Sequence, residues 1–252
     1  MNILVTNDDG IRAPGLKAIV KELADLGSVY VVAPDSEKSA NSHKLTLHGL
    51  IRFKECKMKG AKKAFALWGT PADCVHLGLS CLIDEKIDLV VSGINKGPNL
   101  STDIIYSGTI AAAREAFLRK IPSIALSLAS FTVTDFSTAA RIGKDYALKY
   151  YERKDKHRYF LSVNIPDIPE SEIKGTRICD KTLHVEYHDR YAYEEIDGKT
   201  YINLETTHKR SFMDSDDLDI DYIAISNGYI SVSALYNEHI DKAYTNKLNE
   251  GF

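Results

Sequence analysis

The sequence predicts an α/β fold built around a doubly wound parallel sheet, with a β-rich arm towards the C-terminus. Short apolar runs alternate with amphipathic helical patterns up to about residue 164. Such alternation implies right-handed crossovers between parallel strands. The pattern changes after Pro166, where short strands rich in tyrosine follow one another. A chain of 252 residues is long enough to bury a substantial core in one α/β domain.

The first part of the chain predicts two strands, one helix and a more irregular stretch. The apolar run 3–6 predicts the first strand, and 29–33 predicts the second. The segment 15–26 between them predicts a helix, because its apolar residues fall on one face: Leu16, Ile19, Val20, Leu23 and Leu26. A polar loop at 35–44 leads to an alternating stretch at 45–53, which predicts an excursion or an edge hairpin.

Clear start signals predict the next helix. Thr70 supplies a cap, Pro71 fits the first turn, and Asp73 places an acid near the positive end of the helix dipole. The apolar positions continue to about residue 83, so Cys74 and Cys81, seven residues apart, are expected to share its buried face.

The alternation then continues to the end of the expected core. We expect, in order, a strand at 88–92, a glycine-rich loop at 93–108, a helix at 109–119, a strand at 123–128, a helix at 136–151 and a strand at 159–164.

The C-terminal third follows a different pattern. Segment 173–204 predicts short strands with a turn at Asp197–Gly198, and an acidic stretch at 214–221 precedes a further β-rich segment at 222–235. These segments can complete the sheet, form a separate arm or exchange with a second subunit. A hairpin arm with little core of its own needs a partner surface, so we favour an oligomer interface. We therefore expect a catalytic core at 1–166 and, at 167–252, an oligomerisation arm with sheet-completing segments and no independent domain.

Composition excludes several classes of partner. The formal net charge of −3 and the isoelectric point near 6.2 argue against a nucleic-acid polymer or an acidic membrane as the main partner. The lysine-rich stretch 54–63 is a local exception that resembles a solvated hairpin loop. No apolar run approaches the roughly 18 residues of a membrane helix, and a signal-peptide pattern is missing at the N-terminus. We expect a cytoplasmic protein without disulfides, since its four cysteines form no Cys-x-x-Cys pair.

Two adjacent carboxylates, Asp8 and Asp9, follow the first predicted strand. The carboxyl ends of parallel strands face the crevice where α/β proteins bind ligands. Neighbouring carboxylates suggest a hard divalent cation, which offsets their repulsion. The alternative is a solvated turn in which Asp9 caps the next helix and Gly10 takes a positive φ. The pair alone slightly favours the turn.

Two further loops should open on the same edge of the sheet. Ser39 in the second loop and Asn95 in the third can add neutral oxygens to the carboxylates, a set suited to Mg²⁺, Mn²⁺ or Ca²⁺. A phosphate can then meet backbone N–H groups in the turn Ser107-Gly108-Thr109 at a helix start. Taken singly, each residue is better explained as a turn former, a loop residue or a helix cap.

Other phosphate chemistries lack their motifs. The chain contains no Gly-x-x-x-x-Gly-Lys-Ser/Thr loop, no Gly-x-Gly-x-x-Gly after the first strand and no Gly-x-Ser-x-Gly elbow. An aspartyl-phosphatase site, which needs a second acid two residues after Asp8, fails because that position is Gly10. Among the phosphate chemistries considered, hydrolysis assisted by a metal ion is the one that the sequence does not exclude.

Several motifs together resemble the SurE (survival protein E) family of metal-dependent nucleotidases. They occur in the family's order over nearly the whole chain, at 2–16, 32–35 with Ser39, 69–75, 91–100, 105–109, 162–166 and 228–232. Their joint occurrence is far more specific than any one loop. One departure is Lys44, at a position that the family usually gives to a small residue.

The resemblance implies a Rossmann-like three-layer core with a C-terminal β-hairpin arm used in homodimer or homotetramer formation. It also implies 5′-nucleotidase activity on nucleoside monophosphates, with 3′-nucleotides and polyphosphate as further substrates in some members. The family's metal ligands, for one Mg²⁺ or Mn²⁺ per subunit, fall on Asp8, Asp9, Ser39 and Asn95. Its phosphate pocket falls on Asn41, His43, Ser107, Gly108 and Thr109.

The expected mechanism is in-line attack of water on the phosphate ester, assisted by the ion, with Asp8 or Asp9 as proton acceptor. Two other functions remain open: a metal-dependent nucleotide-binding module without catalysis, and a sugar-phosphate or broad-range phosphatase.

Overall fold

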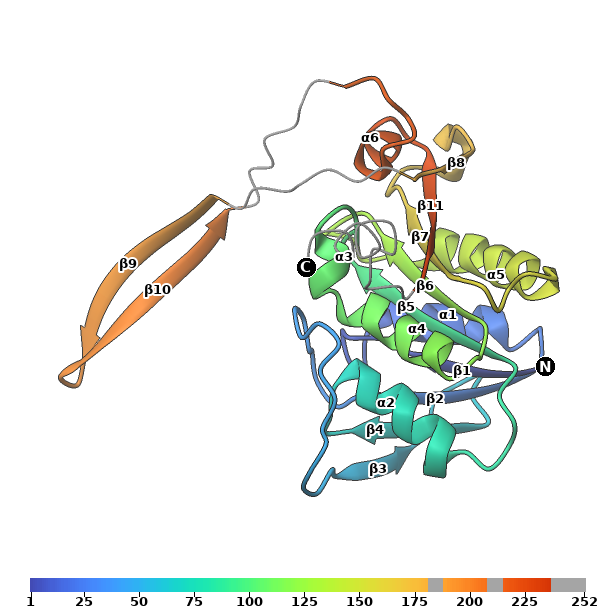
Figure 1. Cartoon of the computed structure of the whole chain (residues 1–252), viewed down its shortest axis with the longest axis horizontal. Coiled ribbons are helices and arrows are strands. Elements are labelled where there is room, and N and C mark those ends of the chain that lie inside the picture. Colours follow the sequence, from blue (N-terminus) through green and yellow to red (C-terminus); the bar gives the residue numbers. More distant parts are fainter. Residues whose placement is uncertain (181–187, 208–214, 237–252) are drawn as a thin grey trace, which may run out of the picture.

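A large mixed sheet forms the centre of the computed structural model, which describes residues 1–180, 188–207 and 215–236 (Figure 1). In the described residues its strand order is β3-β4-β2-β1-β5-β6-β7-β11-β8. The strands are β1 (Asn2–Thr6), β2 (Ser28–Pro34), β3 (Phe53–Cys56), β4 (Lys63–Leu67), β5 (Leu89–Lys96), β6 (Ser123–Leu128), β7 (Phe160–Ile165), β8 (Thr176–Ile178) and β11 (Ile230–Leu235).

The middle of this sheet is parallel, as the sequence predicts. Strands β4, β2, β1, β5, β6 and β7 pair in parallel along the sheet. Antiparallel pairing enters towards the two edges, where β3 pairs with β4 and β11 with β7. Because β1 lies between β2 and β5, the loops that follow these three strands open side by side.

Helices cover both faces of the sheet and complete three layers (Figure 1). One face carries α1 (Pro14–Leu23) and α5 (Ser137–Glu152), and the other carries α2 (Pro71–Leu77) and α4 (Gly108–Leu118). Each pair packs over its own hydrophobic cluster. Helix α1 buries four of the five apolar residues that its periodicity predicts, Leu16, Ile19, Val20 and Leu23, but it ends at Leu23, and Leu26 lies beyond it and is only partly buried. The predicted α/β class is confirmed. None of the described helices is long and apolar enough to cross a membrane.

Three local features differ from the sequence predictions. Strand β4 was not predicted, because its apolar run follows directly on the lysine-rich stretch 54–63, which was interpreted as a solvated loop, and β3 begins only at Phe53 after irregular backbone. A four-residue helix, α3 (Asp103–Tyr106), lies within the predicted loop 93–108. The predicted helix from Thr70 changes at Gly78 to a π-helical turn, Gly78–Leu82.

The π-helical turn explains why the prediction for the cysteines is wrong. Cys74 is buried but Cys81 is exposed. A wider helical turn rotates each residue by a smaller angle than an α-helix does, so seven-residue spacing across it no longer returns to the same face.

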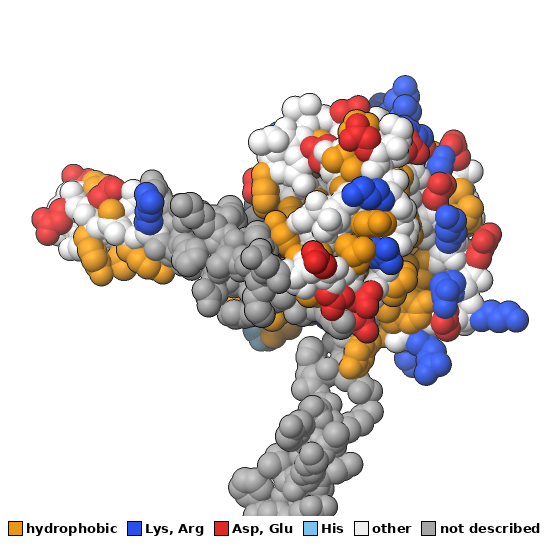
Figure 2. All heavy atoms as spheres, turned by 90° about the horizontal axis from the view of Figure 1, so that it is seen from above, with side chains coloured by type: hydrophobic (Ala, Val, Ile, Leu, Met, Phe, Trp, Pro, Cys, Tyr) orange, Lys and Arg blue, Asp and Glu red, His pale blue; other side chains and the backbone are white. Residues whose placement is uncertain are grey.

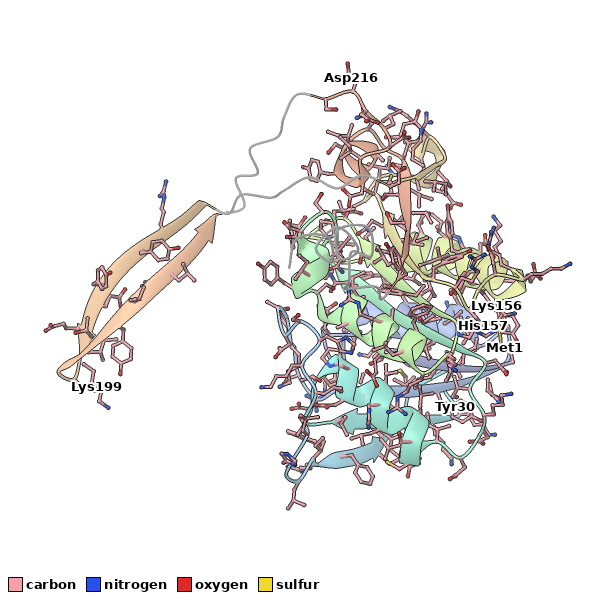
Figure 3. The ribbon with its side chains drawn as sticks, viewed as in Figure 1. Met1, Tyr30, Lys156, His157, Lys199 and Asp216 are labelled. Atoms are coloured by element: carbon pink, nitrogen blue, oxygen red, sulfur yellow. The ribbon has the colours of Figure 1, made fainter. Side chains whose placement is uncertain are left out.

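The C-terminal segments contribute both to the sheet and to a separate hairpin. Strands β8 and β11 extend the main sheet, while β9 (His188–Ile196) and β10 (Lys199–Thr207) pair with each other. The predicted turn at Asp197–Gly198 connects them, with φ of 52° and 71°. Figure 3 shows the hairpin standing apart from the α/β body, with Lys199 at its far end. Part of the β-rich segment 222–235 is instead helical, in α6 (Asp221–Ser226).

Candidate functional site

The two carboxylates lie where β1 ends. Asn7 holds their turn through its amide, which donates to the Gly10 carbonyl (3.1 Å) and accepts from the Gly10 N–H (3.2 Å). Gly10 has a φ of +99°, as the turn prediction requires. Helix α1, however, starts after Ala13 without any side-chain cap, so Asp9 is not a helix cap.

Asp8 is buried against the start of α4. The Thr109 hydroxyl donates to Asp8 Oδ1, and the Thr109 N–H donates to Oδ2 at 3.1 Å. Gly108 makes this approach possible, because a Cβ there would lie 2.9 Å from the Cβ of Asp8 and 3.0 Å from the Cγ of Pro71. Burial raises the pKa of Asp8, and the two Thr109 hydrogen bonds oppose that rise.

Asp9 is more open to solvent than Asp8. Its Oδ2 accepts a hydrogen bond from the Lys96 N–H at 3.1 Å, at the end of β5. Burial and the negative charge of Asp8 raise the pKa of Asp9 to about 6, although the Lys96 hydrogen bond opposes the rise. Glu37 adds further negative charge to the same region. Both carboxylates therefore lie where a cation would be stabilised.

An open cavity of about 180 Å³ lies at this edge of the sheet. It brings together four residues that the sequence analysis selected: Asp8, Ser39, Asn95 and Ser107. The amide nitrogen of Asn95 donates to the Gly97 carbonyl at 2.9 Å, which leaves the amide oxygen as its acceptor. The Ser39 hydroxyl donates to Glu37 at 2.7 Å, so its lone pairs remain for another partner.

Asn41 and His43 are not among the residues that line this cavity. Asn41 donates to the carbonyls of Lys38 (2.9 Å) and Ser39 (3.3 Å), and it thereby holds the 35–44 loop together. His43 Nε2 lies 3.1 Å from a carboxylate oxygen of Glu115 on α4. Lys44 is exposed, and its carbonyl accepts from the Thr70 hydroxyl.

The start of α4 has few N–H groups left for a phosphate. The Ser107 N–H donates to the Asp103 backbone carbonyl, the Thr109 N–H to the Asp8 carboxylate and the Ile110 N–H to the Ser107 hydroxyl. The Gly108 N–H has no acceptor among the residues that the structure describes. Thr109 thus positions Asp8. Ser107 lines the cavity, and Gly108 keeps an N–H without an acceptor among the described residues, so these two residues fit an anion-binding turn better than Thr109 does.

The structure adds cavity residues that sequence reasoning did not assign: Ala40, Lys96, Pro98, Asn99, Asp103, Tyr106 and Phe131. Asn99 lies in the predicted glycine-rich loop 93–108, where its sequence position gives it no role of its own. It is buried and fixed by Asn164, whose amide oxygen accepts from the Asn99 N–H at 2.8 Å. No local motif gives this pairing, because β7 carries Asn164 far along the chain.

The donor set fits a hard cation better than zinc. Across the described part of the chain, no group of three or more His, Cys, Asp or Glu side chains is arranged to hold a metal. The candidate site instead combines two carboxylates with a hydroxyl and an amide oxygen. Neutral oxygens beside carboxylates are typical ligands of Mg²⁺ and Mn²⁺.

Fold and site together define a doubly wound α/β protein with an oxygen-rich cavity at the carboxyl edge of its sheet. The family model described as Survival protein SurE matches residues 3–188, and the chain belongs to this family.

Relatives match over almost their whole length. The chain is 39% identical over 250 residues to a protein from Kosmotoga olearia named 5′-nucleotidase SurE, covering 99% of this chain and 98% of that one. It is 41% identical to the protein of the same name from Geotalea daltonii, covering 98% and 96%. The crystal structure of the SurE protein from Aquifex aeolicus matches with a TM-score of 0.83 and 33% identity, covering 99% of both chains.

Proposed function

We propose that the protein is a divalent-metal-dependent 5′-nucleotidase that releases phosphate from nucleoside monophosphates. The observation that carries the proposal is that Asp8, Ser39 and Asn95 line one cavity. Asp9 lies next to this cavity, since it accepts a hydrogen bond from the N–H of Lys96, another lining residue. Family membership and relatives named 5′-nucleotidase SurE support the activity. In this proposal 3′-nucleotides and polyphosphate are further substrates.

One Mg²⁺ or Mn²⁺ per subunit would be held by Asp8, Asp9, Ser39 and Asn95. When bound, it would neutralise the carboxylates and stabilise charge that develops on the phosphoryl oxygens. Thr109 keeps Asp8 in place through both carboxylate oxygens. Such preorganisation means that the site does not have to rearrange during the reaction.

We assign proton acceptance from the attacking water to Asp9. Asp8 is almost fully buried, and Thr109 occupies both of its oxygens. Asp9 is partly exposed, and the Lys96 N–H engages its Oδ2. Burial and the charge of Asp8 raise the pKa of Asp9 to about 6 without a bound ion, and a divalent cation beside it would favour the ionised form that a proton acceptor needs. In this proposal, the Gly108 N–H and the Ser107 side chain contact the phosphate.

Phosphate release from AMP and GMP tests the proposal. We expect Asp8→Asn and Asp9→Asn to lower turnover by about 100-fold or more, and a chelator to abolish it. Asp145→Asn, an exposed carboxylate on α5, is the matched control and should leave turnover unchanged. Unchanged turnover in either site variant would remove that carboxylate from the mechanism.

A substrate panel separates the remaining alternatives. Saturable nucleotide binding without phosphate release would indicate a binding module. Faster release from sugar phosphates than from nucleotides would indicate a broad-range phosphatase. We expect nucleoside monophosphates to be the preferred substrates when the panel, with 3′-nucleotides and polyphosphate included, is run against Mg²⁺ and Mn²⁺.

We also propose that the chain forms a homodimer or homotetramer through the β9–β10 hairpin. Tyr193 and Ile202 are paired across the two strands, as are Tyr191 and Leu204, so all four lie on one face of the hairpin. They are 53–76% exposed. Figure 2 shows hydrophobic side chains gathered along one side of the hairpin. An apolar face on so small a sheet is typical of a surface that packs on a partner.

A further inference from the structure

A second cavity, of about 550 Å³, lies between α1 and the connection from β3 to β4. It shares no lining residue with the candidate catalytic cavity. It is lined by Ile11, Arg12, Lys17, Lys21, Cys56, Lys57, Met58 and Lys59. Its volume falls within the range of pockets that hold small organic ligands, roughly 300–1,000 Å³.

The lining is strongly cationic. Five of the eight residues are Lys or Arg and none is acidic, in a chain whose formal net charge is −3. Among the described residues, none of these five side chains forms an ion pair. Lys17 and Lys21 are four residues apart on α1, where like charges destabilise a helix. An anion in the cavity would offset this repulsion.

The cavity also has an apolar floor. Ile11 is buried. Cys56 and Met58 are partly buried and pack against the hydrophobic cluster between the sheet and the α1–α5 layer. The aliphatic parts of the lysine side chains add apolar surface above them. A small inorganic anion would satisfy the cations and leave this floor uncovered.

The cavity wall opposite α1 is held in place by backbone contacts. The Ala61 N–H donates to the Met58 carbonyl at 3.2 Å, and the Lys62 N–H donates to the Val29 carbonyl at 2.7 Å. Gly60 lies against α1, where a Cβ would be 3.3 Å from the Val20 carbonyl oxygen. The cavity is thus preformed, which lowers the entropic cost of binding.

We propose that this cavity binds an organic ligand that carries two or more phosphates beside an apolar or planar group, the chemical class of nucleoside di- and triphosphates. Phosphates would contact the lysines and Arg12, which form charge-assisted hydrogen bonds with phosphate oxygens. The apolar group would cover Ile11 and Met58. The lysine-rich stretch 54–63 thereby gains a role beyond that of a solvated loop, because α1 supplies the facing cations.

Calorimetric titration of the full chain with ATP, in the presence of a chelator to prevent turnover, tests the proposal. We expect Lys17→Glu/Lys21→Glu to weaken ATP binding at this cavity by at least about tenfold. The control Lys120→Glu/Lys154→Glu makes the same charge change at exposed positions outside the cavity and should leave affinity unchanged. Equal weakening in both variants would show a general charge effect and overturn the proposal.

Two further ligands test the two halves of the proposed chemistry. AMP, with one phosphate, and tripolyphosphate, with no apolar group, should each bind more weakly than ATP at the site that Lys17→Glu/Lys21→Glu removes. Tripolyphosphate binding as tightly as ATP would overturn the role of the apolar floor. A single-stranded oligonucleotide that binds there more tightly than ATP would replace the proposed ligand with a nucleic acid.

Cys56 gives an independent readout, because it lines the cavity. In a Cys81→Ser background the exposed cysteine is removed, while Cys74 and Cys179 are buried. Burial raises the pKa of the Cys56 thiol, so alkylation rates are compared at one fixed alkaline pH. We expect ATP to slow alkylation of Cys56, and Lys17→Glu/Lys21→Glu to abolish the protection. An alkylation rate that ATP does not change would contradict binding in this cavity.

Discussion

At the scale of single residues, Thr109 determines the environment of Asp8. It is fully buried and donates to both oxygens of that carboxylate. Thr109→Val fills the same space but removes the hydroxyl donor. We expect it to lower nucleotidase turnover by about tenfold, because Asp8 loses a charge-assisted hydrogen bond worth roughly 1.5–3 kcal/mol. Thr109→Ser, which keeps the hydroxyl, should retain most of the activity in the same phosphate-release assay. Equal activity in both variants would contradict this role.

Gly108 allows the start of α4 to approach Asp8. Gly108→Ala would force atoms of Asp8 and Pro71 apart, at a cost of about 1–3 kcal/mol. We expect lower stability in urea unfolding together with a loss of turnover. Gly49→Ala is the control: Gly49 has a φ of +105°, but a Cβ there meets nothing within 4 Å. It should cost stability without changing turnover. Normal turnover in Gly108→Ala would show that the close approach has no role in catalysis.

Part of the candidate site was predictable at this scale, and part was not. Asp8 and Ser39 follow two core strands and Asn95 lies at the end of a third, and the strands' order in the sheet brings them to one cavity. The surroundings of His43 could not be predicted in this way. Its partner Glu115 is on a helix 72 residues away, and only tertiary packing brings the two side chains together.

At the scale of elements, Glu115 connects three segments. The buried carboxylate on α4 contacts His43 in the 35–44 loop, His76 on α2 and Arg119 on its own helix. Burial alone would raise the pKa of Glu115, but the hydrogen bonds from His43, Arg119 and His76 lower it to about 2. The network therefore fixes the loop that carries Ser39 against the α2–α4 layer.

This shift predicts how stability depends on pH. A folded-state pKa of about 2, below the usual 4.5, means that ionised Glu115 stabilises the fold above about pH 4.5, and that this is lost as pH falls towards 2. Glu115→Gln should therefore lower the free energy of unfolding by roughly 2 kcal/mol at pH 7 and by about half as much at pH 3. Urea unfolding at both pH values measures the difference. Glu152→Gln, at an exposed position on α5, is the control. An equal loss at both pH values would exclude the ionised network as the cause.

The elements themselves were predictable where periodicity was long and regular. Helices α1 and α5 each run for ten residues or more with apolar residues that face the sheet. Strand β4 is shorter, and its burial depends on β2 and β3 on either side of it. The π-helical turn after α2 does not change the spacing of apolar residues in the sequence. The exposure of Cys81 therefore could not be predicted from the sequence and is seen only in the structure.

At the scale of the whole molecule, charge and apolar surface are divided among separate regions. The two candidate metal-binding carboxylates follow β1, the cations of the second cavity come from the region of α1 and from the connection between β3 and β4, and an apolar face occupies the hairpin. The formal net charge of −3 is a sum over the whole chain and does not show that acidic and basic residues gather in different regions. Composition could therefore argue against a nucleic-acid polymer as main partner but could not reveal a local anion site.

The hairpin leads to the last prediction, which concerns assembly. Tyr193 and Ile202 lie on its apolar face, while Tyr201, paired with Glu194, lies on the opposite face. We expect the protein to elute as a dimer or tetramer in size-exclusion chromatography with light scattering. Tyr193→Ser/Ile202→Ser should shift it towards a monomer, because an interface loses roughly 1.5–3 kcal/mol for each large apolar side chain that is no longer buried. Tyr201→Ser should leave the assembly intact. A monomeric parent protein, or equal behaviour of the two variants, would contradict assembly through this face.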